Sequence, residues 1–303
     1  MAIFTTKNSD GILPFYLEKS DVRGRVIELN QTLNEILSRH QYPYPVAQLL
    51  AEGLLITAAL SSSLKYRGVF TLQIKGSGPV KLLLIDCTAE GHMRGYAQFT
   101  PNSILETPHQ QFLSIPQIFG SGYLAFTVDQ GENGKRYQGI VELIGLTLSA
   151  CIEEYFRQSE QLQQSIFLAV ERIKNSWYGR LVLLQQIPLS PNASTSTVEQ
   201  ANATERWHEA MLYLSTLKRN EILNQQLPSE RLLKLLFTDQ SLHIEAQRPL
   251  IAQCRCSSQK VQHMLLSFPE DEIKLMQIDG MVHVHCEICN QQYSFKEKDL
   301  LKQ

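Results

Sequence analysis

The sequence has few of the features that mark a secreted or membrane protein. Its first residues, MAIFTTKNSDGILPF, lack the charged segment and apolar core of a signal peptide. The longest apolar stretch, from Val46 to Leu60, is interrupted by Gln48 and Glu52 and is too short and too polar to span a bilayer. We therefore expect a buried helix here and a cytoplasmic protein without a membrane partner, in a compartment where thiols stay reduced.

The sequence also lacks a dominant charge. The 28 Lys and Arg residues are matched by 30 Asp and Glu residues, which gives a formal net charge of −2 at pH 7. Nucleic-acid binders usually present a basic face, so we expect no nucleic-acid partner. Gly76-Ser77-Gly78 lacks the lysine and the spacing of a phosphate-binding loop and should be a turn between strands. With no evident nucleophile and base set either, we expect a protein that is not an enzyme.

The first 187 residues alternate between strand-like and helix-like segments. Helical spacing is seen over residues 31–39, 44–66 and 147–160. Strand-like alternation is seen over residues 23–29, 68–74, 80–87, 92–99, 123–128, 136–143, 166–170 and 180–186. Most of the strands follow one another through short hairpin turns. The pattern predicts an α+β core domain over residues 1–187, with a largely antiparallel sheet packed by helices.

A polar, turn-rich run separates this domain from the rest of the chain. It reads PLSPNASTST over residues 188–197, which is typical of a domain boundary. Ser196 and Glu199 match a capping box, which predicts a helix after them. A second short helix should begin after Pro228. The apolar residues of the two helices are Trp207, Met211, Leu214 and Leu217, and Leu232, Leu233, Leu235 and Leu236. Because such helices need a neighbour to be stable, residues 188–240 are predicted to be a helical linker of marginal stability.

The last segment, residues 241–303, contains four of the six cysteines in two close pairs. Cys254-Arg-Cys256 comes first, and Cys286-Glu-Ile-Cys289 follows. Between the pairs we predict two short helices, one capped by Ser257 and one that begins at Pro269. Asp279-Gly280 is typical of a tight hairpin turn, so the second pair should lie at the tip of a β-hairpin.

One zinc ion is predicted to be bound by the four paired cysteines, Cys254, Cys256, Cys286 and Cys289. Zinc prefers tetrahedral sulfur and nitrogen donors, and four thiolates leave no open position for a reactive water. The site should therefore be structural. His285 is a less favoured alternative ligand, because four thiols are already available. The isolated Cys87 and Cys151 should be small core residues.

A zinc–thiolate site is also sensitive to oxidants, because thiolates are the form of cysteine that oxidants attack. A module of this size cannot stay folded by its core alone, since structural zinc contributes about 10–16 kcal/mol in finger peptides. Oxidation of the ligands should therefore unfold the module. Helices that pack on it should loosen as well.

The C-terminal segment combines CRCS at 254–257, PEDEI at 269–273 and HCEICN at 285–290. In these motifs it resembles the heat shock protein 33 family, the redox-regulated, zinc-binding holdase chaperones of bacteria. In the first domain, the family-like segments are VRG at 22–24, YPYP at 42–45, LK at 64–65, GSGP at 76–79 and YFRQSEQL at 155–162. Two segments depart from the family pattern, Gln163-Gln164 and Tyr178-Gly179-Arg180. Both departures are expected to change only details of the first domain's surface.

The resemblance implies a mechanism. The reduced, zinc-bound protein would be folded and inactive. Oxidation would form the disulfides Cys254–Cys256 and Cys286–Cys289 and release zinc, after which the C-terminal domain and the linker would lose structure. The apolar surface that becomes available would bind unfolding client proteins without ATP. Family members are monomers when reduced and dimerise when activated, so the implied partners are unfolded proteins and a second copy of the chain.

Two other functions remain open. A zinc-ribbon nucleic-acid-binding module would bind DNA or RNA in a salt-sensitive way while reduced, but the linker and zinc segments contain no basic run. A thiol oxidoreductase that uses Cys286 and Cys289 would need a thioredoxin-like βαβ setting, and the predicted hairpin argues against it.

Overall fold

The computed structural model describes residues 10–64, 66–101, 113–131, 134–188, 197–296 and 299–300. Sheet A has the strand order β10-β1-β2-β9-β8, with β11 also paired to β1. It contains β1 (Gly11–Leu17), β2 (Val22–Leu29), β8 (Gln164–Ile173), β9 (Ser176–Gln186), β10 (Leu242–Ile244) and β11 (Arg248–Pro249). All of its pairings are antiparallel.

Sheet B has the strand order β12-β5-β4-β3-β6-β7. It contains β3 (Val69–Gly76), β4 (Val80–Thr88), β5 (His92–Phe99), β6 (Gly122–Asp129), β7 (Arg136–Glu142) and β12 (Ile251–Ala252). The pairing of β12 with β5 is parallel, and the others are antiparallel. The predicted α+β class with largely antiparallel strands is therefore confirmed, and the strands divide between two sheets.

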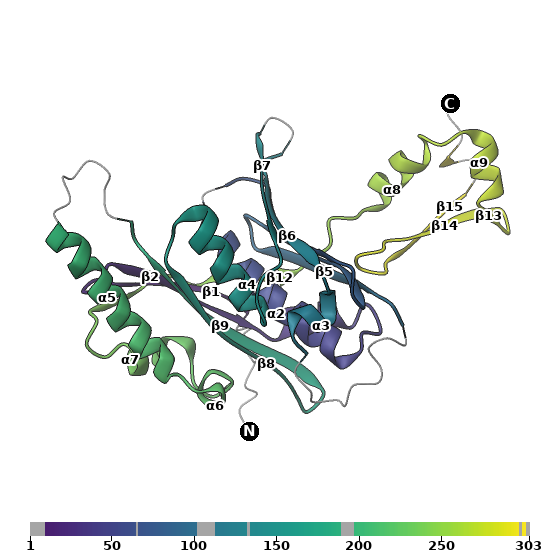
Figure 1. Cartoon of the computed structure of the whole chain (residues 1–303). Helices are drawn as coiled ribbons and strands as arrows, with labels where there is room; N and C mark the ends of the chain where they lie inside the picture. The colour runs from purple at the N-terminus through teal and green to yellow at the C-terminus, as the bar shows by residue number, and fades with distance from the viewer. Residues whose placement is uncertain are drawn as a thin grey trace, which may run out of the picture.

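Helix α2 (Tyr44–Ser61) lies between the two sheets (Figure 1). Its length and composition alone would suit a membrane span, contrary to the expectation from Gln48 and Glu52, but 78% of that window is buried inside the protein. A helix that is apolar all round is stable when neighbours cover every side. The main core therefore contains α2 together with residues from both sheets. The helix ends at Ser61, before the predicted end at residue 66.

Shorter elements close the ends of this core. They are α1 (Gln31–Leu37), α3 (Ile115–Phe119), α4 (Leu148–Tyr155) and the π-helical turn η1 (Phe156–Glu160). Cys87 and Cys151 are 1% and 4% exposed in the same core, which confirms their predicted place. Gly76-Ser77-Gly78 leads from β3 into β4, as predicted.

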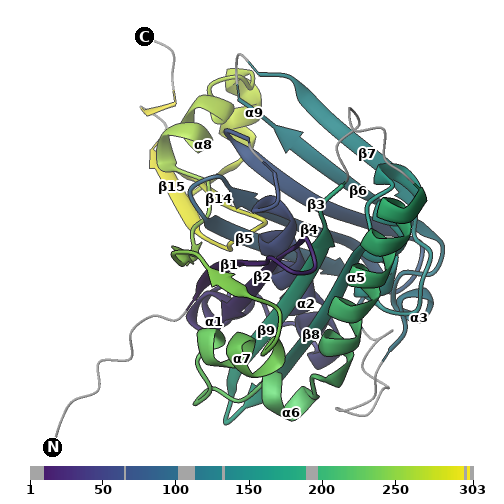
Figure 2. The same cartoon turned by 90° about the vertical axis from the view of Figure 1, so that its left-hand side faces the viewer.

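The linker helices cover the opposite face of sheet A (Figure 2). They are α5 (Thr197–Thr216), α6 (Arg219–Ile222) and α7 (Ser229–Leu236). The predicted stripe is confirmed, because Trp207, Leu214 and Leu217 are buried and Met211 is half-buried against this face. Leu232, Leu233 and Leu236 are buried as well, whereas Leu235 is exposed. The predicted cap residue Ser196 lies outside the described residues.

A buried ion pair fastens α7 to sheet A. The Nη2 atom of Arg180 lies 2.9 Å from Oε2 of Glu28, and Arg180 is fully buried. The same guanidinium donates to the carbonyl of Leu227 at 3.0 Å, and the Ser229 hydroxyl donates to Glu28 at 2.7 Å. The expectation that the two departures affect only the surface is therefore wrong for Arg180, which lies beneath the linker. It is also wrong for Tyr178 and Gln164, which are 1% and 8% exposed.

The C-terminal module has a small core of its own. It contains α8 (Ser258–Leu265), α9 (Glu270–Leu275) and the three-stranded sheet of β13 (Gln277–Ile278), β14 (Met281–His285) and β15 (Gln292–Lys296). Leu265, Ile273, Val282, Phe295 and Leu300 form its buried cluster. Asp279 and Gly280 both have positive φ, as a two-residue hairpin turn between β13 and β14 requires.

The chain between the linker and this module runs along the edges of both main sheets. Strand β10 pairs with β1, and Leu250 is fully buried in the main core. The predicted division at residue 241 remains a proposal, and these pairings favour a boundary near residue 253. Residues 251–256, which we call the arm, then extend along β5 to the first cysteine pair.

Candidate metal centre

The first cysteine pair is placed by the arm and by the start of α8. The Gln253 amide donates to the Met93 carbonyl at 2.8 Å, which holds the arm beside β5. After Cys256, the Ser257 hydroxyl accepts from the Lys260 amide at 3.2 Å and caps α8, as predicted. Cys254 and Cys256 therefore lie in a bend between an edge strand and a helix N-terminus.

The second pair lies at the tip of the β14–β15 hairpin, as predicted. The Asn290 amide donates to the Cys286 carbonyl at 2.8 Å, and the Cys286 amide donates to the Gln291 carbonyl at 2.9 Å. Asn290 has a φ of 56°, a left-handed conformation that asparagine tolerates better than most residues. This tight turn directs both sulfurs to one side. It is not the βαβ setting that a thioredoxin-like centre would need.

The structure brings the four predicted sulfurs together. The sulfur atoms of Cys254, Cys256, Cys286 and Cys289 all lie within 4.8 Å of one another. The Sγ atoms of Cys254 and Cys286 are 3.9 Å apart, and those of Cys256 and Cys289 are 3.4 Å apart. A tetrahedral zinc ion with Zn–S bonds of about 2.3 Å requires sulfur separations of about 3.8 Å. The donor set therefore fits zinc, and His285 is not part of the cluster.

The thiols of the cluster differ in acidity. Burial alone would raise the pKa of Cys254, but hydrogen bonds from the Cys256 amide and from Arg94 lower it to about 7. Burial raises the pKa of Cys256 and that of Cys289. The Tyr293 hydroxyl donates to the Cys256 sulfur at 3.1 Å, which favours a thiolate there. A bound cation would favour four thiolates, because metal binding displaces the thiol protons.

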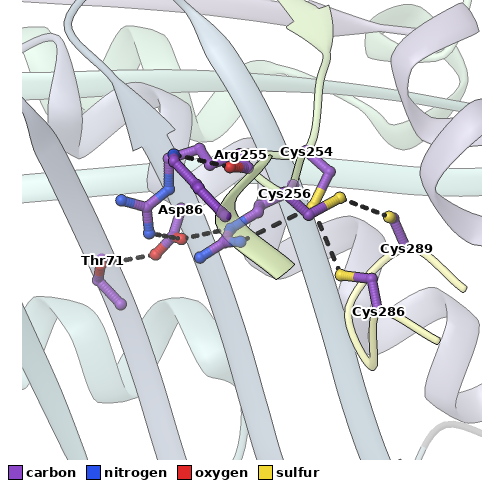
Figure 3. A network of polar contacts seen from close by, with 9 residues as sticks. Thr71, Asp86, Cys254, Arg255, Cys256, Cys286 and Cys289 are labelled. Carbon is purple, nitrogen blue, oxygen red and sulfur yellow. Dashed lines mark hydrogen bonds and ion pairs between the residues drawn. The ribbon is translucent and has the colours of Figure 1, made fainter. Parts of the chain in front are cut away.

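The first domain supplies polar groups to this centre (Figure 3). Nη1 of Arg94 lies 3.7 Å from the Cys254 sulfur, and Nε of Arg94 donates to Asp86 at 2.6 Å. Arg255, between the first two cysteines, donates to the same Asp86 oxygen at 2.6 Å. The ring nitrogen Nε2 of His40 lies 3.1 Å from the Ile288 carbonyl oxygen, so the second pair also contacts the first domain.

Sequence reasoning missed the contribution of Asp86 and Arg94. A signal was present: Asp86 interrupts the apolar run of β4, and the short turn before β5 places it opposite Arg94 in the ladder. A charged residue inside a buried strand needs a partner. Nothing in the spacing of the cysteines indicates that Arg255 would reach this carboxylate.

Comparison with known proteins gives a consistent result. The family model described as "Hsp33 protein" matches residues 10–296. A "33 kDa chaperonin" of Caulobacter vibrioides is 32% identical over 94% of this chain and 94% of its own length. A "33 kDa chaperonin" of Pseudomonas aeruginosa is 32% identical over 97% and 94%. The crystal structure of a 33 kDa chaperonin from Thermotoga maritima matches with a TM-score of 0.77, 20% identity and 96% coverage of both chains, which supports the fold.

Proposed function

The chain belongs to the Hsp33 protein family, and we propose that it is a chaperone that binds unfolding proteins without ATP and is switched on by oxidation. The observation that carries this proposal is the cluster of four sulfurs at the end of an arm that continues from the linker covering sheet A. The protein would act by binding and not by catalysis. We place it in the cytoplasm, where reduced thiols are the resting state.

The four thiolates of Cys254, Cys256, Cys286 and Cys289 would hold one zinc ion in the reduced state. When bound, zinc would supply a structural cross-link between the two halves of the C-terminal module. The module needs this cross-link, because its buried cluster of five apolar side chains is small. Supporting hydrogen bonds come from Tyr293 and Arg94.

Oxidation would convert the ligands into two disulfides, Cys254–Cys256 and Cys286–Cys289. For each disulfide, two thiolates, one hydrogen peroxide and two protons give one disulfide and two waters. In the folded state, sulfur contacts of 3.9 and 3.4 Å join one pair to the other. Those contacts depend on the folded module, whereas each pair stays together within its own short segment when the module opens. The within-pair disulfides are those that the family resemblance implies, and they remain possible in an oxidised module that has unfolded.

The surface to be uncovered is the apolar face of sheet A beneath α5, α6 and α7. It presents Leu13, Phe15, Val26, Val182 and Leu184, all at most 4% exposed under the linker. Helix α7 contacts β10, and the chain then passes through Leu250 to the arm. Loss of the C-terminal module would thus loosen the segment that follows the linker. The freed apolar face would bind exposed apolar segments of unfolding proteins.

The test combines client protection with metal and thiol counts. Aggregation of a thermally unfolding client is followed with the reduced protein and with protein treated with peroxide at mild heat. We expect zinc with free thiols and no protection in the first sample, and zinc loss, two disulfides and protection in the second. An oxidised, zinc-free sample that protects no client would contradict the proposal. Sedimentation of the same samples should show a monomer becoming a dimer.

A further inference from the structure

A charged network outside the four cysteines joins the candidate metal centre to sheet B. Asp86 on β4 is 3% exposed, and it accepts hydrogen bonds from three side chains. Thr71 donates to its Oδ1 at 2.6 Å, whereas Arg94 and Arg255 both donate to its Oδ2 at 2.6 Å. Figure 3 shows Asp86 between Thr71 on one side and Arg255 with the cysteines on the other.

The three donors come from different parts of the chain. Thr71 on β3 and Arg94 on β5 are neighbours of Asp86 in the strand ladder, so they belong to the sheet itself. Arg255 belongs to the arm and is the residue between Cys254 and Cys256. One carboxylate therefore connects the sheet to the turn that carries two of the four sulfurs.

We propose that Asp86 is a latch for the arm, which it fastens to sheet B through Arg255, and that Arg94 joins the same carboxylate to the Cys254 sulfur. Asp86 and Arg94 are then positioning residues of the metal centre, supplied by the first domain. This inference rests on the proposed function, because it takes the four thiolates to be the redox-controlled ligands. The latch holds the arm in the reduced protein and lets it go in the oxidised protein.

Release of Arg255 does not leave the buried Asp86 carboxylate without a partner. When Arg255 departs, Asp86 keeps the hydrogen bonds from Arg94 and Thr71, so its carboxylate stays paired. The Arg255 side chain is 39% exposed in the latched state, so its guanidinium becomes hydrated at little cost. Undocking of the arm therefore exposes no unpaired ion, unlike the removal of one partner from a buried ion pair.

The contact between Arg94 and Cys254 makes the latch sensitive to oxidation. A guanidinium interacts strongly with a thiolate, and this attraction is lost when the sulfur becomes part of a neutral disulfide. Docking of the arm therefore stabilises the reduced protein but does not stabilise the oxidised protein. By linkage, a variant that weakens docking must make oxidation of the cysteines easier.

The first measurement is hydrogen exchange of the arm in the reduced, full-length chain. The amides of Ile251 and Gln253 donate to the carbonyls of Gly91 and Met93, so their protection reports docking. Arg255→Gln removes the positive charge that Asp86 binds. The docked arm then loses the contribution of one charged hydrogen bond at a partly exposed site, so we expect exchange of these amides to accelerate about 5–30-fold. Asp86→Asn should have a similar effect, and the double variant should add nothing further.

The second measurement is the two-electron thiol–disulfide midpoint of Cys254 and Cys256 in dithiothreitol redox buffers. A 5–30-fold loss of docking corresponds to a midpoint about 20–45 mV more negative in Arg255→Gln. The matched control is Glu154→Gln, which breaks the exposed pair with Arg157, outside the arm and the metal centre, and should change neither quantity. A loss of stability confined to the main core, which stays folded on oxidation, would not move the midpoint.

The outcomes separate the latch from the proposed function. Unchanged exchange in Arg255→Gln, or effects of the two single variants that multiply in the double variant, would overturn the latch. Faster exchange with an unchanged midpoint would overturn its coupling to oxidation. If Asp86→Asn does not fold, Arg255→Gln still decides, because Arg255 is partly exposed. An oxidised wild-type chain that protects no client would defeat the proposed function and leave the exchange result standing.

Discussion

At the scale of single residues, burial divides the six cysteines into two groups. Cys87 and Cys151 lie in the main core, and burial raises the pKa of each thiol to about 11. The four cysteines of the candidate metal centre are half-buried near the surface. Only the second group is accessible to oxidants, and within it the hydrogen bonds from Arg94 to Cys254 and from Tyr293 to Cys256 favour thiolates.

This division predicts the pattern of alkylation. Reduced, chelator-treated protein at about pH 8 should be modified at the four clustered cysteines, which are half-buried, and spared at Cys87 and Cys151, which are 1% and 4% exposed. The raised pKa of the Cys87 and Cys151 thiols also keeps them protonated in the folded state. The unfolded thiols ionise near pH 9, so the contribution of these two residues to stability should fall as the pH rises from about 9 to about 11. Peptide mass spectrometry with and without denaturant provides the check. Rapid modification of Cys87 in the folded chain would contradict the account.

A second prediction concerns the ion pair beneath the linker. Glu28→Gln leaves the fully buried Arg180 without its counter-charge and should lower the free energy of unfolding of the reduced protein by about 3–5 kcal/mol. The control is Asp21→Asn, which breaks the exposed pair with Arg206 and should cost about 0–1 kcal/mol. Asn also tolerates the positive φ of residue 21. Equal urea midpoints for the two variants would show that the buried pair does not hold the linker.

At the scale of elements, strands with strong alternation and the C-terminal hairpin were predictable. Strand β1 was not, because GILPFYL is apolar throughout and buried on both faces, so it shows no period of two. Strands β10 to β12 contain only two or three residues each and depend on partners distant in sequence. Their pairing with β1 and β5 could not be read from local pattern.

The candidate site was predictable to a similar degree. The cysteine spacing identified all four sulfurs, because zinc sites impose local geometry on each pair. Asp86, Arg94 and Arg255 come from three separate segments, and only the strand register and the arm bring them together. Arg180 was misjudged because a departure from a family pattern does not tell on which side of a sheet the side chain lies.

The linker helices contain a natural reporter of their own release. The chain has two tryptophans: Trp207 on α5 is 6% exposed against sheet A, and Trp177 is 7% exposed in the main core. In Trp177→Phe, peroxide oxidation should shift the remaining emission to longer wavelength as Trp207 meets water. In Trp207→Phe, the remaining emission should stay nearly constant. If the emission shifts only in Trp207→Phe, where Trp177 is the remaining tryptophan, the conformational change lies in the core and not in the linker.

At the scale of the whole molecule, the three parts of the proposed redox switch follow one another along the chain. The helical linker covers an apolar sheet face, the arm pairs with the second sheet, and the four clustered sulfurs would hold the terminal module together through a bound zinc ion. The segments that would open are those with the smallest cores of their own, as expected for elements of low local stability. The two-sheet core around α2 has the largest set of buried side chains and would remain folded as the platform.

The most direct test of this account is hydrogen exchange of the full-length chain before and after peroxide oxidation, followed over α5, α7, the C-terminal module and α2 in one sample. The account predicts strong protection of all four regions when the protein is reduced and zinc-loaded. After oxidation, protection should be lost over residues 197–237 and 254–296 and kept over α2. Unchanged protection of residues 197–237 in a fully oxidised, zinc-free sample would contradict it.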